Sequence, residues 1–431
     1  MPISFPVWKP AMHHMSGERP LRIAFLTPEF VNGDYIPGGL AAYVYRISKA
    51  LTEMGNEVEV FTLSASDHRK EEVFTFDGIR VEPVKRRYNL PLKVISRLRL
   101  NRYLRIRQTY LQLALSLGFA HSFEARESEK RFDFVQSSDV GCPGLFVRKL
   151  PGRPLMVRCS WVRDLWLRAD GAPRIFDINC TSGLQKALIR RADRAYAPSR
   201  FVADYYFRKC GLRVETLRPP FLMDAEAARE VPWKLPKRFL FHFGTLGPIK
   251  GTDVLSAALP IVWRRAPDFT MIWAGKGRVW GARGQEDRPD VFREYSHAWG
   301  KQASQVLWLG EIRKPLLYAV LKRAESSVLP SRYDNLPNTA IESLFLGVPV
   351  IGTYGSSIDE LVEPGLNGGL VPVGDPAALA EEMLKVWRGE VTWTGSGFRY
   401  PSVLNEMKPD VAASNLLRLA GFSDVRDGKV A

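Results

Sequence analysis

The feature that most constrains this chain is a buried strand that leads through a glycine-rich loop into an amphipathic helix. Residues 21–27 form a short apolar run, which predicts a buried strand. A loop with Gly38 and Gly39 follows, and apolar residues then recur at helical spacing from Leu40 to Met54. Residues 57–62 form a second strand. This order predicts a parallel βαβ unit, because parallel strands need a crossover connection.

The same pattern starts again in the second half of the chain. Helices are expected over Asp253–Arg264 and Ala377–Arg388, and a proline-rich stretch at 218–236 separates the two halves. Further strands are expected at 132–135, 155–159, 194–197, 239–243, 270–274, 305–309, 326–329, 349–352 and 369–372. We therefore expect an α/β protein with two doubly wound halves. Ligands bind such sheets outside the carboxyl ends of the strands, so the cleft between the halves is the expected site.

Composition excludes several other classes of protein. A length of 431 residues fits two or three domains of roughly 150 residues each. No apolar run approaches the roughly 18 residues of a spanning helix, and residues 1–20 lack the apolar core of a secretory signal, so we expect a loose N-terminal tail. The four cysteines are far apart and show no metal-ligand spacing. A cytoplasmic protein without a metal site is expected.

The charge balance indicates an anionic partner. Lysine and arginine total 61 against 46 acidic residues, a formal net charge of +15. Nine basic residues and no acid lie between Lys85 and Arg107, interleaved with apolar residues at near-helical spacing. The segment is interpreted either as a basic amphipathic helix on an anionic membrane or as a surface helix with solvated charges. Nucleic acid is not expected, because no recognition motif accompanies the charge.

The strongest chemical signal lies between Pro330 and Val350. A strand is expected to end at Pro330, and a helix begins near Asn338 after a short loop. Asp334 lies in the loop and Glu342 in the helix, so both can face one bound molecule. A helix N-terminus binds anions, and a nearby acid accepts hydrogen bonds from hydroxyl groups. Taken alone, the segment fits better as a helix capped by Asp334 or Asn338, with Glu342 favourably placed near its N-terminus.

This segment resembles the nucleotide-sugar site of glycosyltransferase family 4, the large retaining family of GT-B fold. The family signature has two acids separated by seven residues and then a glycine–proline strand, which here is Gly347 to Ile351. Other elements occur in family order: Gly38-Gly39, Ala192-Asp193, 197–199, 243–251, 273–277, 307–310, 356–360 and 365–369. The resemblance spans about residues 21–390 and implies two Rossmann-like domains that face a central cleft.

The resemblance also implies roles for individual residues. Lys250 stabilises the charge that develops on the diphosphate leaving group, and Asp334 faces the donor sugar. Gly38, Gly39 and Gly244 let the backbone approach the donor. Leu336, Pro337, Asn338 and Thr339 would form the helix-terminus part of the site, where the residues other than proline offer backbone N–H groups, and Glu342 would accept hydrogen bonds from the ribose. These groups replace a metal, so no cofactor is expected beyond the nucleotide sugar itself.

Three positions depart from the family pattern. The first acid is Asp334 rather than glutamate, Thr245 replaces a phosphate-binding arginine, and Ser160 stands where a histidine is usual. These changes bear on how well the chain would catalyse transfer. They leave open a catalytically weak GT-B protein that acts as a binding partner.

We expect a tail at 1–20, an acceptor-side domain at 21–225, a nucleotide-sugar domain at 235–395 and a segment at 396–431 whose helix returns to the first domain. The expected function is retaining, metal-independent transfer of a hexose to a sugar or glycolipid acceptor, in glycolipid or polysaccharide assembly. The expected location is the cytoplasm, with peripheral contact at the inner face of the membrane. A GT-B epimerase that acts on the nucleotide sugar is a further alternative.

Overall fold

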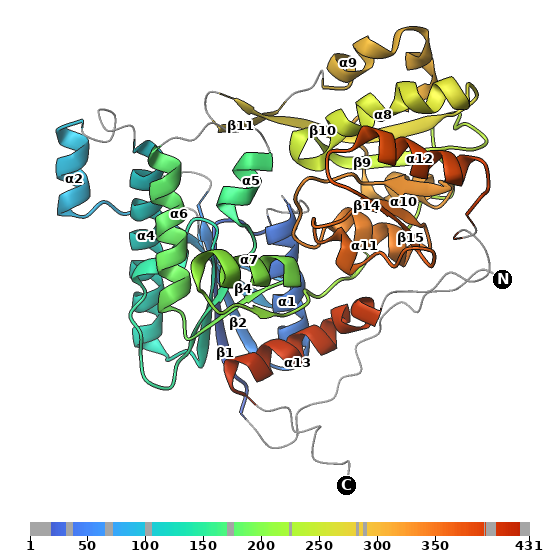
Figure 1. Cartoon of the computed structure of the whole chain (residues 1–431). Coiled ribbons are helices and arrows are strands. Elements are labelled where there is room, and N and C mark those ends of the chain that lie inside the picture. The colour runs from blue at the N-terminus through green and yellow to red at the C-terminus, as the bar shows by residue number, and fades with distance from the viewer. Residues whose placement is uncertain are drawn as a thin grey trace.

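The computed structural model describes residues 19–31, 38–64, 72–99, 106–169, 176–223, 226–281, 284–287, 291–391, 393 and 402–422. Two α/β halves lie side by side, and their sheets are separate (Figure 1). The two halves expected from the sequence are confirmed.

The N-terminal half contains an eight-stranded sheet. Its strands lie in the order β3 (Phe74–Phe76), β4 (Ile79–Val84), β2 (Glu57–Leu63), β1 (Arg22–Thr27), β5 (Phe134–Ser138), β6 (Leu155–Arg158), β7 (Arg194–Ala197) and β8 (Glu215–Thr216). All neighbours are parallel except β3 and β4. The helices are α1 (Gly39–Glu53), α2 (Leu90–Arg97), α4 (Arg107–Glu129), α5 (Arg163–Ala169), α6 (Phe176–Arg191) and α7 (Arg200–Cys210).

Helices cover both faces of this sheet, which explains the continuous apolar run of β1. Ile23 and Phe25 pack with α1 on one face. Ala24 and Leu26 pack with α4 on the other face. A strand covered on both sides buries every side chain, so it loses the alternation of a half-exposed strand.

The C-terminal half contains a seven-stranded sheet. Its strands lie in the order β11 (Gly284–Asp287), β10 (Met271–Gly281), β9 (Leu240–Leu246), β13 (Ser326–Val328), β14 (Val350–Thr353) and β15 (Gly368–Val371), and β12 (Val306–Trp308) also pairs with β10. The helices are α8 (Thr252–Arg265), α9 (Val291–Ser296), α10 (Lys314–Leu321), α11 (Asn338–Phe345) and α12 (Pro376–Trp387). Helices α8 and α12 cover one face, and α10 and α11 cover the other.

The chain returns to the first half after this domain. Short 3₁₀ segments connect the elements: η1 (Pro143–Phe146), η2 (Pro248–Lys250), η3 (His297–Gln305), η4 (Ile358–Glu360) and η5 (Ser402–Met407). The last helix, α13 (Pro409–Ala420), lies beside α1 (Figure 1). Its Ala413, Leu416 and Leu417 belong to the same buried cluster as β1 and α1.

The expected end of the strand at Gly275 is wrong. Strand β10 continues to Gly281 and pairs with β11 as an antiparallel hairpin. Gly275 has a φ of 141°, and a Cβ built there would lie 1.8 Å from the carbonyl oxygen of Gly244 on β9. The glycine therefore permits the close approach of two strand backbones and does not end the strand.

The expectation of one basic helix over Lys85–Arg107 is also wrong. Helix α2 covers only Leu90–Arg97, and Asn89 caps it by accepting a hydrogen bond from the Leu92 N–H at 3.2 Å. Arg99 then adopts a left-handed conformation with a φ of 54°, which stops the helix. Two of the basic residues of the segment, Arg102 and Arg105, lie outside the described residues. No helix in the described part of the chain is long and apolar enough to cross a bilayer.

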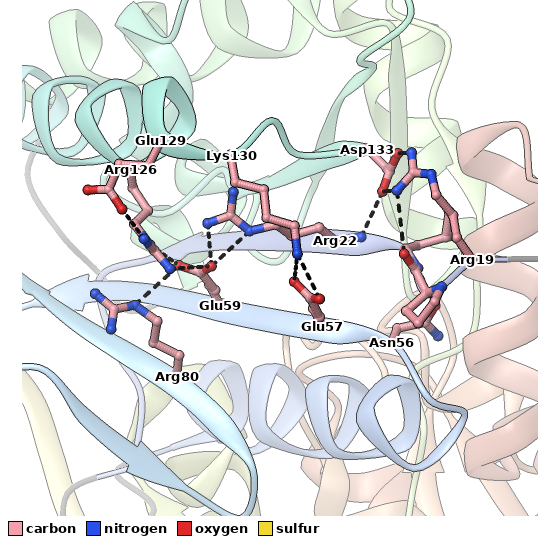
Figure 2. Close-up of polar contacts among 12 residues, drawn as sticks. Arg19, Arg22, Asn56, Glu57, Glu59, Arg80, Arg126, Glu129, Lys130 and Asp133 are labelled. Atoms are coloured by element: carbon pink, nitrogen blue, oxygen red, sulfur yellow. Dashed lines mark hydrogen bonds and ion pairs between the residues drawn. The ribbon is translucent and has the colours of Figure 1, made fainter.

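A buried ion-pair network joins β1, β2, β4 and α4 (Figure 2). Glu59 accepts from Arg22 Nε at 3.0 Å and from Arg126 Nε at 2.9 Å, and Arg80 Nε lies 3.3 Å from its second oxygen. The Arg22 side chain is 1% exposed. Because a buried charge without a partner is costly, these three arginines fix how β2 and α4 sit on the sheet.

Candidate functional site

A cavity of about 710 Å³ lies between the two halves. Its lining comes from the start of α1, the end of β6 and α5 on one side. On the other side it comes from the ends of β9 and β13 and the loop that leads into α11. These are the carboxyl ends of parallel strands, where doubly wound sheets bind ligands.

An ion pair occupies the centre of the C-terminal wall. Lys250, which ends η2, donates a hydrogen bond to Asp334, and the Ser331 hydroxyl donates to the same carboxylate at 3.3 Å. Lys250 is 28% exposed and Asp334 13%. The two residues expected to act in catalysis are therefore adjacent, and each compensates the charge of the other. No group of three or more His, Cys, Asp or Glu residues with metal-binding geometry occurs among the described residues.

The loop from Leu336 to Thr339 leads into the N-terminus of α11. Leu336 has a φ of 60°, an uncommon conformation for a residue with a side chain, and its N–H donates to Ser357 Oγ at 2.7 Å. A Cβ built at Gly39 of the opposite wall would lie 3.8 Å from the Asn338 amide nitrogen, and one at Gly244 would lie 3.0 Å from the Thr339 methyl group. Gly244, with a φ of 113°, therefore needs to be glycine at this close approach, whereas the distance at Gly39 is an ordinary van der Waals contact.

The structure brings together most of the residues expected in the site. Those that line the cavity are Gly39, Gly244, Lys250, Asp334, Leu336, Pro337, Asn338 and Thr339. Thr245 and Ser160, which differ from the family pattern, also line it. Gly38 is the extended residue before α1 and is not among the lining residues. Glu342 is also absent from the lining: it is 1% exposed, and its carboxylate accepts a hydrogen bond from Lys314 of α10. The two acids of the motif do not face the same cavity here.

The N-terminal wall contains residues that the sequence did not single out. Arg158 ends β6, is 6% exposed and stacks at 3.7 Å on the ring of Tyr43, while its Nη1 donates to Ser160 Oγ. Arg163 lies 5.1 Å from the Trp161 ring centroid, and burial lowers the pKa of its guanidinium. Two arginines and two tryptophans within nine residues after a strand are a signal that could have identified this wall.

Asp139, at the end of β5, holds this wall in place. Its carboxylate accepts from the backbone N–H groups of Ser160 at 2.8 Å and Trp161 at 3.3 Å, and from Gln185 Nε2 at 2.7 Å. Burial raises the pKa of Asp139 to about 6. A carboxylate with two oxygens can satisfy all three donors at once, which a neutral amide cannot.

Direct hydrogen bonds join the loop before α11, which contains Tyr333, Asp334 and Asn335, to the N-terminal half. The Asn335 amide donates to the carbonyl oxygens of Cys159 at 3.2 Å and Ser160 at 2.8 Å, and its oxygen accepts from Ser199 Oγ at 2.7 Å. The Val162 N–H donates to Tyr333 Oη at 3.0 Å. The loop with Asp334 is therefore positioned by the end of β6 as well as by its own domain.

Glu360 of η4 forms a second bridge between the halves. It accepts from the first two backbone N–H groups of α7, Arg200 at 3.0 Å and Phe201 at 2.9 Å, and pairs with Arg218 at 2.7 Å. The first N–H groups of a helix have no partner within the helix, so an acid from the other domain satisfies them.

Two family models match the chain and together span most of it. The model described as Glycosyltransferase Family 4 matches residues 37–218, and the model described as Glycosyl transferases group 1 matches residues 237–388. The chain belongs to glycosyltransferase family 4. It is accordingly a glycosyltransferase of GT-B fold, and the cavity described above lies between its two domains.

Similar proteins are known for this family 4 glycosyltransferase. A D-inositol 3-phosphate glycosyltransferase from an Arthrobacter strain is 25% identical over 379 residues, 81% of this chain and 83% of that protein. The lipopolysaccharide core biosynthesis mannosyltransferase of Rhizobium meliloti is 28% identical over 190 residues, 43% of this chain and 52% of that protein. The sucrose-phosphate synthase from Thermosynechococcus elongatus superposes with a TM-score of 0.70 at 16% identity, over 93% of this chain and 98% of that one.

Proposed function

We propose that this glycosyltransferase moves a hexose from a nucleotide-diphosphate sugar to an acceptor, with retention of configuration and without a metal ion. The observation that supports this most is the common cavity of Lys250, Asp334 and the head of α11, with Gly39 opposite them. The similarity to a lipopolysaccharide mannosyltransferase further supports a role in glycolipid or polysaccharide assembly.

Lys250 is proposed to stabilise the departing diphosphate. Negative charge grows on that group in the transition state, and a fixed cation at this place lowers the barrier. In the described structure Lys250 pairs with Asp334. When the donor binds, Lys250 would therefore contact the phosphates, either in place of Asp334 or together with it. Asp334, next to the loop backbone, would then face the donor sugar.

The N-terminus of α11 is proposed to hold the phosphates in place. Its first residues, Asn338 and Thr339, line the cavity, and the first N–H groups of a helix have no partner within the helix. Such groups bind anions without a metal. Glu342 is proposed to accept hydrogen bonds from the ribose. This role requires donor binding to expose its buried carboxylate to the cavity and to share it with Lys314.

The test is a transfer assay with a panel of nucleotide sugars and a chelator. We expect donor turnover that persists in the chelator, and a product with the anomeric configuration of the donor. Lys250→Ala should lower turnover by at least tenfold while nucleoside binding stays within about threefold. Glu342→Ala should weaken nucleotide binding by roughly tenfold to 150-fold, the loss of a charge-assisted bond of about 1.5–3 kcal/mol.

Four outcomes of that assay count against the proposal. Inverted product excludes retention, and loss of activity in chelator excludes metal independence. Rearranged nucleotide sugar in the absence of acceptor indicates an epimerase. Nucleotide binding with neither transfer nor hydrolysis indicates a binding protein.

We propose that α2 places the acceptor side of the cleft at an anionic membrane. Leu90 and Leu98 are 75% and 62% exposed, and Val94 is 45% exposed between them, four residues from each. Lys93, Arg97 and Arg99 surround this apolar stripe. Each basic residue near an anionic membrane surface contributes about 1 kcal/mol to the free energy of membrane binding, and added salt screens this attraction.

Vesicle sedimentation tests the membrane proposal. Wild type should bind anionic vesicles and leave them as salt rises, whereas Lys93→Gln/Arg97→Gln/Arg99→Gln should bind several-fold more weakly. A matched control replaces three basic residues at a distant surface, Arg208, Lys209 and Arg213. Equal binding by both triple variants, or no binding by wild type, contradicts a membrane role for α2.

A further inference from the structure

Two arginines of the N-terminal wall have no carboxylate partner among the described residues. Arg158 and Arg163 both line the cavity, and neither forms one of the ion pairs found in the described part of the chain. Arg158 is 6% exposed. The Nε atoms of both arginines and the indole nitrogen of Trp161 are buried without a hydrogen-bond acceptor.

Three other buried arginines in the described part of the chain are paired with an acid. Arg22 pairs with Glu59, Arg153 with Glu127 at 2.8 Å, and Arg218 with Glu360 at 2.7 Å. A buried cation without a counter-ion is costly, so proteins normally supply an acid as they do at these three positions. Arg158 differs from these three, because none of the ion pairs in the described residues includes it.

The acids near these arginines have other partners. Near Arg163, Asp177 accepts from the first backbone N–H groups of α4 at 2.7 and 2.8 Å, and Asp164 pairs with Lys186 at 3.1 Å. The acid near Arg158 is Asp139. Both oxygens of Asp139 accept hydrogen bonds from the Ser160 and Trp161 backbone and from Gln185. The hydrogen-bond acceptors that the arginines do have are neutral: the Ser160 hydroxyl for Arg158 and the Gln108 amide oxygen for Arg163. The cavity wall thus has two guanidinium groups whose hydrogen-bond acceptors within the described residues are neutral, and an anion in the cavity would supply the missing negative charge.

We propose that Arg158 and Arg163 bind a phosphate group of the acceptor substrate. The guanidinium group presents donors in a planar fork that matches phosphate oxygens. Trp161 and Trp166 line the same cavity at a ring-centroid distance of 5.1 Å, and they give the sugar of such an acceptor an apolar surface to pack on. The inference rests on the proposed function, because it assigns the donor phosphates to Lys250 and α11 on the opposite wall.

The phosphate could belong to a free sugar phosphate or to a phosphate ester on a lipid. Calorimetry separates these sources when the protein is first saturated with the tightest binder among UDP, GDP and ADP, which fills the donor site. Glucose 6-phosphate, glucose and farnesyl phosphate in detergent micelles are then titrated. We expect at least one of the two phosphate esters to bind. If glucose 6-phosphate binds, glucose should bind at least tenfold more weakly.

Variants test whether the two arginines are responsible. Arg158→Gln and Arg163→Gln should each weaken binding of the phosphate ester at least tenfold and change nucleoside diphosphate affinity less than twofold. Arg208→Gln, on the exposed face of α7, should change neither. Arg158→Lys keeps the positive charge but loses the planar guanidinium. Its affinity for the phosphate ester should therefore lie between those of wild type and Arg158→Gln. The melting temperature of each variant shows whether the fold is intact.

Two results overturn the inference. One is that neither phosphate ester binds the nucleotide-saturated protein. The other is that Arg158→Gln and Arg163→Gln weaken nucleoside diphosphate binding as much as they weaken binding of the ester, because the arginines then belong to the donor site. If no nucleoside diphosphate binds the wild type but a phosphate ester still does, the proposed donor function fails and the phosphate site stands.

Discussion

Replacing Glu360 by glutamine should uncouple the two domains. Glu360 and Arg218 are 9% and 6% exposed, and their pair connects η4 of one half to the segment after β8 of the other. Removing one partner of a buried pair costs about 3–5 kcal/mol. Glutamine keeps one acceptor for the N–H groups of α7, so we expect Glu360→Gln to lose about 3 kcal/mol of unfolding free energy.

A double-mutant cycle isolates the contribution of the pair. Urea unfolding of Glu360→Gln, Arg218→Gln and the double variant should give a coupling energy of about 1.5–3 kcal/mol, the value of a charge-assisted bond. Glu381→Gln is the matched control, because its partner Arg265 is 41% exposed and exposed pairs contribute about 0.2–1 kcal/mol. A coupling energy below about 0.5 kcal/mol would refute the assignment of Glu360 as the domain bridge.

The same variant should affect donor binding. Ser357 lies three residues before Glu360 and accepts the Leu336 N–H at 2.7 Å. If η4 shifts when the bridge to α7 is lost, the loop at Leu336 shifts with it. We therefore expect a several-fold higher KM for the donor with little change in kcat. An unchanged KM would mean that the loop at Leu336 is held in place by its own domain alone.

Three further variants test other parts of the structure. Glu59→Gln should destabilise the chain by about 3–5 kcal/mol in urea unfolding, because it leaves the network of Figure 2 without its acid, whereas Glu129→Gln should cost under about 1 kcal/mol. Gly251→Ala should destabilise far more than Gly389→Ala: both have left-handed φ angles, of 67° and 69°, but a Cβ at Gly251 would lie 1.9 Å from the Pro330 carbonyl oxygen and one at Gly389 meets nothing within 4 Å. The third variant, Asp139→Asn, concerns pH. Burial raises the pKa of Asp139 to about 6, above its unfolded value of about 3.9, so this group makes stability fall by up to about 3 kcal/mol as pH rises from 4 to 6. Burial lowers the pKa of His242 to about 4, below its unfolded value of about 6.5, so its contribution has the opposite sign in the same range. Asp139→Asn should therefore make unfolding free energy rise more steeply between pH 4 and 6.5 than in wild type, and parallel pH profiles would contradict this.

Local patterns predicted the elements of the fold because their signals lie within a few residues. The apolar run at 21–27 became β1, and helical spacing after Gly39 became α1. The motif from Pro330 to Val350 likewise predicted the loop and α11, with Asp334 before the helix and Glu342 inside it. In these cases the spacing of the apolar residues and the glycine or proline residues that end the element all lie in one short stretch of sequence.

Long-range contacts were not predictable in this way. Nothing near Glu360 indicates that it caps a helix about 160 positions earlier in the chain, and nothing near Asn335 indicates its bonds to the end of β6. The prediction of one helix over 85–107 was wrong for a related reason. Its composition fits a helix throughout, but Arg99 leaves the helical conformation and α4 begins again at Arg107.

The sequence by itself determined that this chain forms two α/β halves, and its ordered motifs identified the family. Only the tertiary structure decided which charges meet. It paired Lys250 with Asp334, it turned Glu342 toward Lys314, and it left Arg158 on the cavity wall without a carboxylate. The physical reason is that secondary structure follows from the spacing of neighbouring residues. The partner of a charge, by contrast, depends on which distant elements pack against it, and folding alone brings those together.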